Sequence, residues 1–196
     1  MFYRPADGHG LPHNPFNAIV TPRPIGWIST TGTLGDNIAP HSFFNAVAYV
    51  PPQVIFASTG IKDSLTNIRE TGVFAVNIVE EAMLNAMSET SALLPRGQDE
   101  FLLNGLPKAP CETIDCPRLA GAPATLECRV VQEVQLLGRD NILVIGEVTG
   151  IHLRDDCLVN GRFDPTRFHP VARMGYRDYA IVRDVVELAR PNERGR

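Results

Sequence analysis

The sequence predicts a mainly β protein whose strands form a closed or nearly closed barrel, with helices at its periphery. Short apolar segments alternate with turns rich in Gly and Pro along most of the chain. Two long extended segments, 124–130 and 142–153, follow each other across a tight GRDN turn and should pair antiparallel. Only two stretches carry a helical pattern. About six or seven strands are therefore expected, and closing them into a barrel removes exposed strand edges.

The N-terminal part opens with an irregular arm (1–16) and a short strand-like AIV segment. IGWIST (25–30) is a strand, and TGTLGD turns the chain into a second extended segment that runs through SFFNAVAYV until Pro51 stops it. Pro40 lies within this segment and cannot donate to a sheet ladder. We therefore expect an edge, a bulge or an irregular rim here, with free backbone N–H groups that face outward.

Two further strands flank a short helix. QVIFAS (53–58) is almost wholly apolar, as expected for a strand that is buried on both faces. SLTNIRET then makes about two helical turns, with Asp63 or Ser64 capping its start and Gly72 closing its end. VFAVNIV (73–79) is the next strand.

A long segment, 80–123, interrupts the barrel strands. Its first part, EEAMLNAMSETSALL, is typical of an amphipathic helix whose Met83, Leu84 and Met87 face the core. A polar, proline-broken connection (95–123) follows. The segment either covers a pocket and selects an acceptor or forms the surface of a dimer.

The last two strands show the clearest pattern. In the first, apolar residues alternate with polar ones, which predicts a half-buried strand. Its inward set is Ala124, Leu126, Cys128 and Val130, and its outward set is Thr125, Glu127 and Arg129. In the second, Gly146 and Gly150 mark bends or close backbone approach. A C-terminal tail (181–196) completes the chain.

Length and composition indicate one globular domain over residues 1–196, with 44% hydrophobic residues, 20% charged residues and a net charge of -4. No Lys/Arg block interleaves with aromatic residues, so neither a nucleic acid nor a membrane surface is an expected partner. The N-terminus has Pro, Gly and His where a secretory signal would be apolar, and no segment approaches the roughly 20 apolar residues of a membrane span. We therefore expect a cytoplasmic protein.

The four cysteines, Cys111, Cys116, Cys128 and Cys157, should remain reduced in that compartment. Cys111 and Cys116 enclose four residues, which fits the wide end of a zinc-ligand spacing. However, Cys128 lies within an alternating strand and no paired-histidine motif follows. Structural thiols are therefore favoured over a zinc site, and no metal is predicted.

Three polar segments are candidates for a binding site. The first surrounds the turn after IGWIST, where small neutral hydrogen-bonding groups suit a flat heteroaromatic ring with carbonyl and imine edges. These groups belong to Ser29, Thr30, Asn37, Ser42 and Asn45. The alternative is that they only satisfy backbone groups where strands end.

The second segment, FASTGIKDSLTNIRETG, leads from a buried strand through Ser58 and Thr59 to a helix start beside Lys62. Helix N-terminal N–H groups, hydroxyls and one lysine form an anion site that suits a single phosphate. Neither GxxxxGK[ST] nor GxGxxG is present, which disfavours a nucleoside triphosphate or a Rossmann-bound dinucleotide. The alternative is a capped helix beside a solvated lysine.

The third segment, FHPVARMGYRDYA, brings His169, Arg173 and Gly175 together. Arg173 offers a fork of donors to the same phosphate, and Gly175 permits close backbone approach. The alternative is a surface arginine beside an ordinary turn.

Together these segments resemble the flavin reductase-like, FMN-binding split-barrel family, in the branch that includes flavoredoxin. The resemblance covers nearly the whole chain, roughly from Asn17 to Tyr179. It depends on the order and spacing of PRPIGWIST, the following G..N.APHSFFNAV, PPQVIFAS, KDSLTNIRETGVFAVNIV, IGEV and the final P.AR.G..Y.

The resemblance implies a six-stranded Greek-key split barrel that forms a homodimer, with FMN near the subunit interface. The residues that it assigns to FMN are Ser29 and Thr30 (ring and ribityl chain), Ala39, Pro40, His41 and Ser42 (polar edge of the ring), Asn45 (an amide), Ser58, Lys62 and Ser64 (phosphate), and Arg173 (phosphate).

The implied function is an oxidoreductase that passes electrons from NAD(P)H through bound FMN to free flavin, a partner oxygenase or another acceptor. The flavin carries this chemistry, which agrees with a sequence that has no catalytic triad, carboxylate pair or nucleophile elbow. Reductases of the family often carry GDH before the IGEV-like strand, and its His has been linked to the nicotinamide. Here the run is GRDN, so Asn141 takes that place. His41 and His169 are the other catalytic candidates.

Two rival functions stay open. A flavoredoxin-like FMN electron carrier or flavin-binding module would not turn over NAD(P)H itself. The presence of Asn141 in place of the histidine is consistent with this alternative. A purely structural barrel would bind no cofactor.

Overall fold

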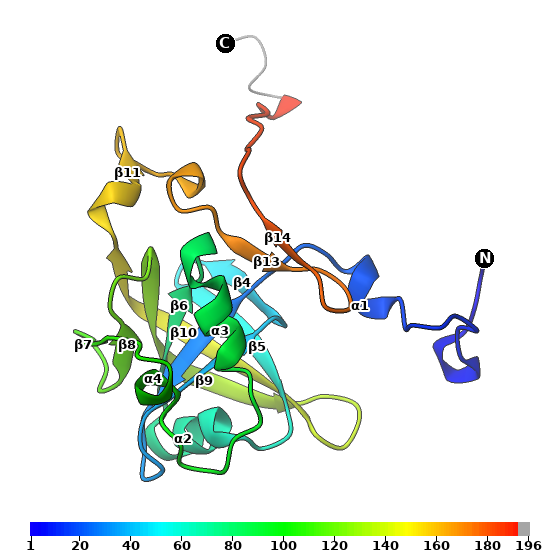
Figure 1. Cartoon of the computed structure of the whole chain (residues 1–196), viewed down its shortest axis with the longest axis horizontal. Helices are drawn as coiled ribbons and strands as arrows, with labels where there is room; N and C mark the ends of the chain where they lie inside the picture. Colours follow the sequence, from blue (N-terminus) through cyan, green and yellow to red (C-terminus); the bar gives the residue numbers. More distant parts are fainter. Residues whose placement is uncertain (192–196) are drawn as a thin grey trace.

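The computed structural model describes residues 1–191 and is mainly β, with short helices around one large antiparallel sheet (Figure 1). Every neighbouring pair of strands in this seven-stranded sheet is antiparallel. Across the sheet the order is β3 (Asn37–His41), β2 (Gly26–Thr30), β6 (Val73–Ile78), β9 (Ala124–Gln135), β10 (Asn141–Leu153), β5 (Pro52–Thr59) and β4 (Phe44–Tyr49).

Smaller sheets and short helices surround this sheet. The small sheets are β1 (Arg23–Pro24) with β13 (Val171–Arg173) and β14 (Tyr179–Ile181), β7 (Lys108–Pro110) with β8 (Pro117–Leu119), and β11 (Leu158–Val159) with β12 (Arg162–Phe163). The α-helices are α1 (Phe16–Ile19), α2 (Asp63–Thr71), α3 (Leu84–Glu89) and α4 (Glu100–Leu103). Single 3-10 turns are η1 (Pro5–Asp7), η2 (Glu81–Met83), η3 (Asp155–Cys157) and η4 (Pro165–Arg167).

The large sheet closes into a barrel because its two edge strands are consecutive in the chain. β3 and β4 lie at opposite ends of the strand order, yet only Ser42 and Phe43 separate them. The sheet therefore has to curl until its edges meet, and His41 at the end of β3 then lies beside β5, with its Nδ1 3.4 Å from the carbonyl oxygen of Ala57. The predicted barrel with peripheral helices is confirmed.

Pro40 lies on the edge strand β3, which agrees with the expectation for a proline in an extended segment. It is opposite Trp27 of β2, and β2 is the one neighbour of β3 in the sheet. The outer side of β3 thus needs no ladder donor at this position.

Two apolar clusters hold the barrel and its cover together. Ile28, Phe56, Leu65, Phe74 and Val144 belong to the cluster inside the barrel. The second cluster joins the outer face of β2 to segment 80–123, with Trp27, Met87 and Phe101 fully buried, or nearly so, in it. Met83 and Leu84 pack against this second cluster, so the prediction that these methionines and leucine face the core is confirmed.

Three sequence-based assignments of elements are wrong. The strand-like AIV lies in and just after α1, a single helical turn. The long helix expected from residue 80 consists of η2 and α3, which ends at Glu89. The connection 95–123 contains α4 and the β7–β8 hairpin. The helical pattern in the sequence continues past Glu89, but in the structure α3 ends there and the following residues line the cavity of the barrel.

The burial patterns of β5 and β9 also differ from expectation. In β5, Val54, Phe56 and Ser58 are buried while the residues between them are partly exposed, so the strand has one buried face. In β9, Thr125 and Glu127 are buried although the alternation placed them outside. The reason is that loop 111–113 covers this face and donates hydrogen bonds to the Glu127 carboxylate.

The start of α2 differs from the prediction, whereas the predicted end of the helix at Gly72 is confirmed. Lys62 occupies the N-cap position and no side chain caps the helix, so capping by Asp63 or Ser64 is wrong. At the other end Gly72 is left-handed, with φ of 71°, and its N–H donates to Ile68.

Both glycines of β10 lie at irregularities of the β9–β10 ladder, as predicted. Register shifts occur between Ile145 and Gly146 and between Val148 and Gly150. A Cβ at Gly146 would stand 2.5 Å from the ring of Phe74, which explains the glycine by close packing.

The described chain contains no helix that is long and apolar enough to cross a membrane. Cys116, Cys128 and Cys157 are buried thiols and Cys111 is half-buried. Of the predicted C-terminal tail, residues 192–196 lie outside the described part.

Candidate functional site

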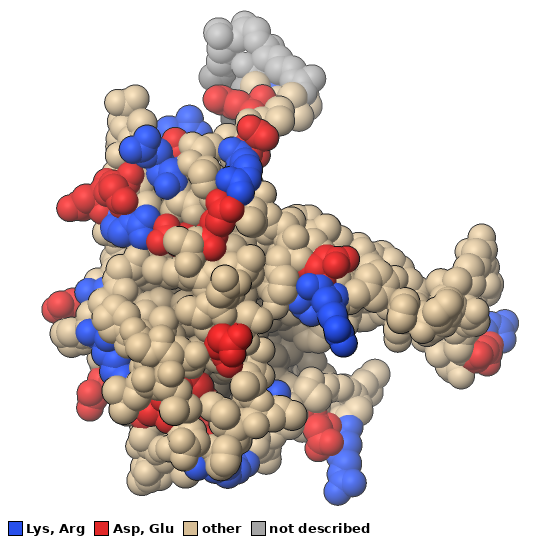
Figure 2. Space-filling view, in the orientation of Figure 1, with Lys and Arg blue, Asp and Glu red and all other residues tan. Residues whose placement is uncertain are grey.

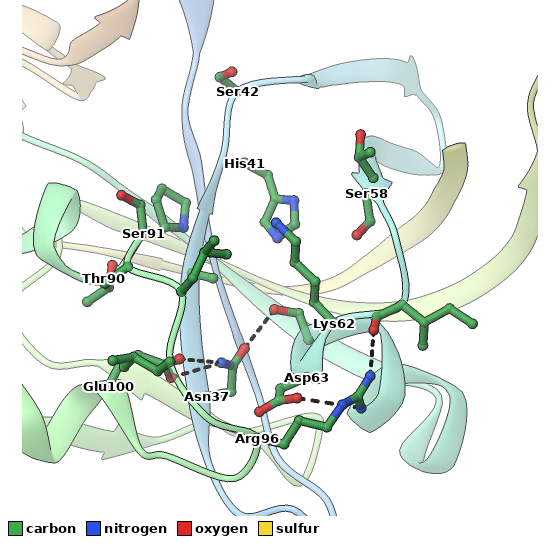
Figure 3. Close-up of a pocket in the computed structure, with 18 of the residues that line it drawn as sticks. Asn37, His41, Ser42, Ser58, Lys62, Asp63, Thr90, Ser91, Arg96 and Glu100 are labelled. Carbon is green, nitrogen blue, oxygen red and sulfur yellow. Dashed lines mark hydrogen bonds and ion pairs between the residues drawn. The ribbon is translucent and has the colours of Figure 1, made fainter. Parts of the chain in front are cut away.

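A cavity of about 410 Å³ lies where the barrel closes, which is within the roughly 300–1,000 Å³ of small-molecule sites (Figure 3). The end of β3, the end of β5, the start of α2 and the loop 90–96 surround it. Its lining residues are Asn37, Ala39 to Phe43, Ala57 to Thr59, Ile61 to Ser64, Thr90 to Arg96 and Glu100.

The start of α2 lies at the cavity, which Lys62, Asp63 and Ser64 line. Leu65 and Ile68 anchor the helix in the barrel core, which fixes the direction of its axis. The first backbone N–H groups of a helix have no partner within it, and the helix dipole adds to their charge. Lys62 precedes this turn, and its side chain runs toward His41 (Figure 3).

A buried hydrogen-bond network forms the floor of the cavity. Nδ2 of Asn37 donates to both carboxylate oxygens of Glu100, at 2.9 and 2.8 Å, and Oδ1 of Asn37 accepts from the hydroxyl of Ser64 at 2.6 Å (Figure 3). The backbone N–H of Ile38 also donates to Glu100. Burial raises the pKa of Glu100, and the neighbouring charge of Asp63 adds to this effect. The network thus joins β3, α2 and α4 at one point.

His41 supplies a neutral ring to the cavity wall. Burial lowers the pKa of His41 to about 4, and the charge of Lys62 acts in the same direction. The ring packs edge-on against Phe56, with centroids 4.8 Å apart, and Nδ1 lies 3.4 Å from the carbonyl oxygen of Ala57. Nε2 is buried and has no hydrogen-bond partner within the described residues. A ligand group in the cavity would satisfy it.

The loop 90–96 closes the cavity from the side of segment 80–123. At its start, the hydroxyl of Thr90 accepts from Nε1 of the buried Trp27 at 2.9 Å. At its end, Arg96 donates to the carbonyl of Ile61 at 2.6 Å and to Thr66 at 3.2 Å, across the start of α2. Its guanidinium also lies 3.7 Å from Asp63. Segment 80–123 therefore covers the cavity, which was one of the two roles expected for it.

The structure brings most of the sequence-predicted site residues to this cavity. They are Ala39, Pro40, His41, Ser42, Ser58, Lys62 and Ser64. Ser29 and Thr30 instead lie fully buried in β2. Ser29 donates to the carbonyl of Pro117 at 2.7 Å, so its side chain faces the cover of the barrel.

The other predicted residues lie outside the cavity. Asn45 is exposed on β4 and accepts from the N–H of Ala46. Asn141 begins β10, where its side chain donates to the carbonyl of Leu137 and holds the hairpin turn. Nδ1 of His169 lies 3.5 Å from Oε2 of Glu81. Arg173 lines a separate cleft beside the N-terminal arm.

The sequence interpretation did not assign Glu100 or the loop 90–96 to the site. Both come from a segment more than thirty positions from the first site residues in the sequence, and no local pattern signals their contact with β3 and α2. The one available signal was the TSALLPR stretch, whose polar and proline residues do not fit a continuing helix.

These features fit a flavin better than a metal ion. The walls offer neutral groups and an unpartnered ring nitrogen for a heteroaromatic ring, and the α2 end offers N–H groups and Lys62 for an anion. Within residues 1–191, no cluster of three or more His, Cys, Asp or Glu side chains is placed to hold a metal.

The fold is that of a split-barrel protein, and its cavity is large enough for a small molecule. The chain belongs to the family described as Flavin reductase like domain, whose model matches residues 19–170. The resemblance drawn from the sequence is thereby confirmed. Membership in this family supports a flavin-related oxidoreductase.

Solved structures agree with this assignment. The 2-nitrobenzoate 2-nitroreductase of Pseudomonas fluorescens is 30% identical, with a TM-score of 0.82 over 89% of this chain and 88% of that one. Component B of nitrilotriacetate monooxygenase from Bacillus cereus is 28% identical, with a TM-score of 0.84 over 92% and 100%. Flavoredoxin of Desulfovibrio vulgaris shares the fold, at 21% identity and a TM-score of 0.79 over 90% and 94%.

Proposed function

We propose that this protein is an FMN-dependent oxidoreductase that takes electrons from NAD(P)H and passes them to free flavin, a partner oxygenase or another acceptor. The observation that carries the proposal is the cavity, which combines neutral polar groups at the end of β3 with the N-terminus of α2 and Lys62. A ring with a single anionic tail matches this distribution of charge.

The residues would divide between the two ends of the ligand. Lys62 and the backbone N–H groups that begin α2 would hold the phosphate, with Ser58, whose hydroxyl donates to the carbonyl of Gly60 at 3.0 Å, beside them. The backbone of Ala39 to Ser42 would face the polar edge of the ring, with His41 neutral beside it. Because the cavity has one such anion site, we favour FMN over a dinucleotide flavin.

Bound flavin would supply the electron-transfer chemistry, and the protein would position the reactants and exclude water. The loop 90–96, held at Trp27 and at Ile61, would restrict access from one side. His41 is uncharged near neutral pH and would offer its unpartnered Nε2 as a hydrogen-bonding group.

We further propose a homodimer. The edge strand β4 and the residue after it expose a run of apolar side chains, including Val47, Tyr49 and Val50. A contiguous exposed apolar patch marks an interaction surface, and a second copy of this chain would cover it. This would bring a second subunit close to the place where the barrel closes.

The range of acceptors is supported by the relatives. One is a reductase of 2-nitrobenzoate and another is a component of a nitrilotriacetate monooxygenase. A reduced flavin produced at the cavity would serve either kind of reaction.

The second candidate function is an FMN electron carrier without NAD(P)H turnover. It is favoured by Asn141, which the sequence resemblance puts where reductases of the family often carry a histidine and whose amide is bonded into the hairpin turn. That amide is poorly placed to receive a nicotinamide.

Two measurements on freshly purified protein test these proposals. The visible spectrum, with chromatography of the boiled supernatant against FMN and FAD standards, identifies the cofactor. NADH or NADPH is then added in air, and absorbance at the nicotinamide band is followed. Oxidation of the dinucleotide supports the reductase, a yellow protein that leaves it unoxidised supports the carrier, and a colourless protein whose melting temperature ignores FMN contradicts both.

A further inference from the structure

A second cleft, of about 530 Å³, lies beside the cavity and carries two arginines. We call it the arginine cleft. The N-terminal arm, the end of β13 and the link between β3 and β4 enclose it. The space-filling view shows the surface hollowed between the barrel and the arm that carries α1 (Figure 2). The residues that matter here are His13, Arg23, Ser42, Phe43, Arg173 and Tyr176.

Arg23 and Arg173 are direct cross-strand neighbours in the pairing of β1 with β13. Within residues 1–191, neither forms an ion pair with an Asp or Glu side chain. Burial, and then the charge of Arg173, lower the pKa of Arg23. Two adjacent cations without a counter-charge are unfavourable, and an anion between them would relieve the repulsion.

Arg23 is fixed and still has a donor to spare. Its terminal nitrogens donate to the carbonyls of Asn17, Val20 and Met174, at 2.5, 2.6 and 2.9 Å. Its Nε is buried and has no hydrogen-bond partner within the described residues. A buried N–H without an acceptor is unusual, so it points to a missing group.

Arg173 is more accessible and is also held in place. Its guanidinium lies over the ring of Tyr179, 4.5 Å from the centroid, and one nitrogen donates to the carbonyl of Tyr176 at 2.6 Å. Its other donors remain available to a ligand, and a guanidinium presents them as a fork that matches carboxylate or phosphate oxygens.

The wall of the cleft is built on tight backbone contacts. A Cβ at Gly175 would stand 2.4 Å from the Cβ of Ala18, so the glycine lets the arm pack against the turn. Tyr176, a non-glycine residue, has a φ of 56° in that turn. Strained conformations of this kind cluster at ligand sites, where the surrounding structure maintains them.

The arginine cleft adjoins the cavity. Ser42 and Phe43 line both hollows, so only the link between β3 and β4 separates them. The guanidinium of Arg23 lies 5.6 Å from the centre of the Phe43 ring. A molecule with its anionic group between the arginines could therefore extend past this link toward the proposed flavin.

We propose that the arginine cleft binds the anionic group, a carboxylate or a phosphate, of the molecule that exchanges electrons with the flavin. This inference rests on the proposed function, and it assigns Arg173 to the reaction partner instead of to the phosphate of FMN.

Calorimetric titrations of the FMN-loaded protein test the assignment, with the flavin spectrum followed in parallel. The probes are benzoate, its neutral analogue benzamide, and inorganic pyrophosphate. We expect at least one of the anions to bind and benzamide not to bind. Arg173→Gln should weaken the affinity for the anion by about tenfold or more. Arg173→Lys should restore part of the affinity. Arg177→Gln, at an exposed arginine of the same turn, is the matched control and should bind as wild type.

The probes also separate two sources of the anionic group. Binding of benzoate alone identifies an organic acid acceptor, whereas binding of pyrophosphate alone identifies the dinucleotide donor, and either result supports the proposal. It is overturned if neither anion binds, if Arg177→Gln loses as much affinity as Arg173→Gln, or if Arg173→Gln loses FMN instead. Should the wild type bind no FMN, the proposed function fails, while the same titrations of the flavin-free protein still test the cleft.

Discussion

The hydroxyl of Ser64 donates its single proton to Oδ1 of Asn37, and the orientation of that amide is set by Glu100. Because Nδ2 of Asn37 faces both oxygens of the carboxylate, Oδ1 has to face Ser64. The hydroxyl proton is therefore already used within the protein. For an anion at the start of α2, Ser64 then offers its backbone N–H, while Lys62 offers a full charge.

This difference gives the first prediction. Lys62→Ala should weaken the binding of FMN by about tenfold to a hundredfold, since a hydrogen bond to a charged group contributes about 1.5–3 kcal/mol. Riboflavin, which lacks the phosphate, should be nearly unaffected. Ser64→Ala should cost less FMN affinity than Lys62→Ala, and the double variant should retain the FMN-specific loss. Fluorescence titration of the wild type and the three variants with each flavin measures these affinities, and equal losses for FMN and riboflavin would remove the anion site from α2.

Loss of Arg96 should shorten the residence of the cofactor. Arg96→Ala removes the bonds to Ile61 and Thr66 that hold the end of loop 90–96 over the cavity. We expect FMN to dissociate several times faster in stopped flow, with little change in the free energy of unfolding because the side chain is exposed. Arg118→Ala, which removes a half-buried arginine bonded to the carbonyl of Pro110, is the control. A dissociation rate like that of wild type would show that the loop is held by its apolar contacts.

His41 predicts a pH dependence of stability. The pKa of His41 in the folded protein, about 4, is below the ordinary value of 6.5. Between pH 4 and 6.5 the imidazole is therefore protonated in the unfolded chain and neutral in the folded chain. Stability should therefore fall as pH drops from about 6.5 to about 4, by up to about 3 kcal/mol, and this contribution should level off below pH 4.

Urea unfolding at several pH values measures the effect of His41. The buried Trp27 is the chain's one tryptophan and reports the transition. His41→Gln should flatten the curve between pH 4 and 6.5, and His13→Gln, at an exposed histidine of the arm, should not. A slope that is unchanged in His41→Gln would contradict the neutral, buried state of the ring.

Gly146 should not tolerate a side chain. Gly146→Ala places a methyl group 2.5 Å from Phe74 in the barrel core, and such overpacking typically costs about 1–3 kcal/mol. Phe74→Leu should recover part of this loss in the double variant, although it destabilises the wild type alone. Additive losses would place the strain in the backbone of β10 instead of at the ring.

Much of the barrel was predictable from local patterns. The strands β2, β6, β9 and β10 and the end of α2 at Gly72 all follow from periodicity and turn chemistry in short windows. The edge position of Pro40 follows from its missing N–H, and the orientation of Met87 follows from helical spacing. These features depend on neighbouring residues only.

The features that were missed depend on contacts between distant segments. Glu127 looks like an outward residue of β9, but loop 111–113 covers it, and three donors from that loop, with His152, lower its pKa to about 2 in spite of burial. Glu100 reaches the cavity in the same way, through the packing of α4 on β3. The separation of Arg173 from the cavity depends on how the N-terminal arm folds across β13. No hydrophobic periodicity in the sequence predicts the path of that arm.

The meeting of the barrel's two edges at Ser42 and Phe43 has a kinetic consequence. The hydrogen bond from the Ala57 N–H to the carbonyl of Phe43 extends the β4–β5 ladder to the wall shared by the cavity and the arginine cleft. A molecule bound in either hollow would contact this link and should hinder local separation of β4 from β5. Exchange of the Ala57 amide with solvent deuterium should consequently slow in proportion to the lifetime of whatever occupies either hollow.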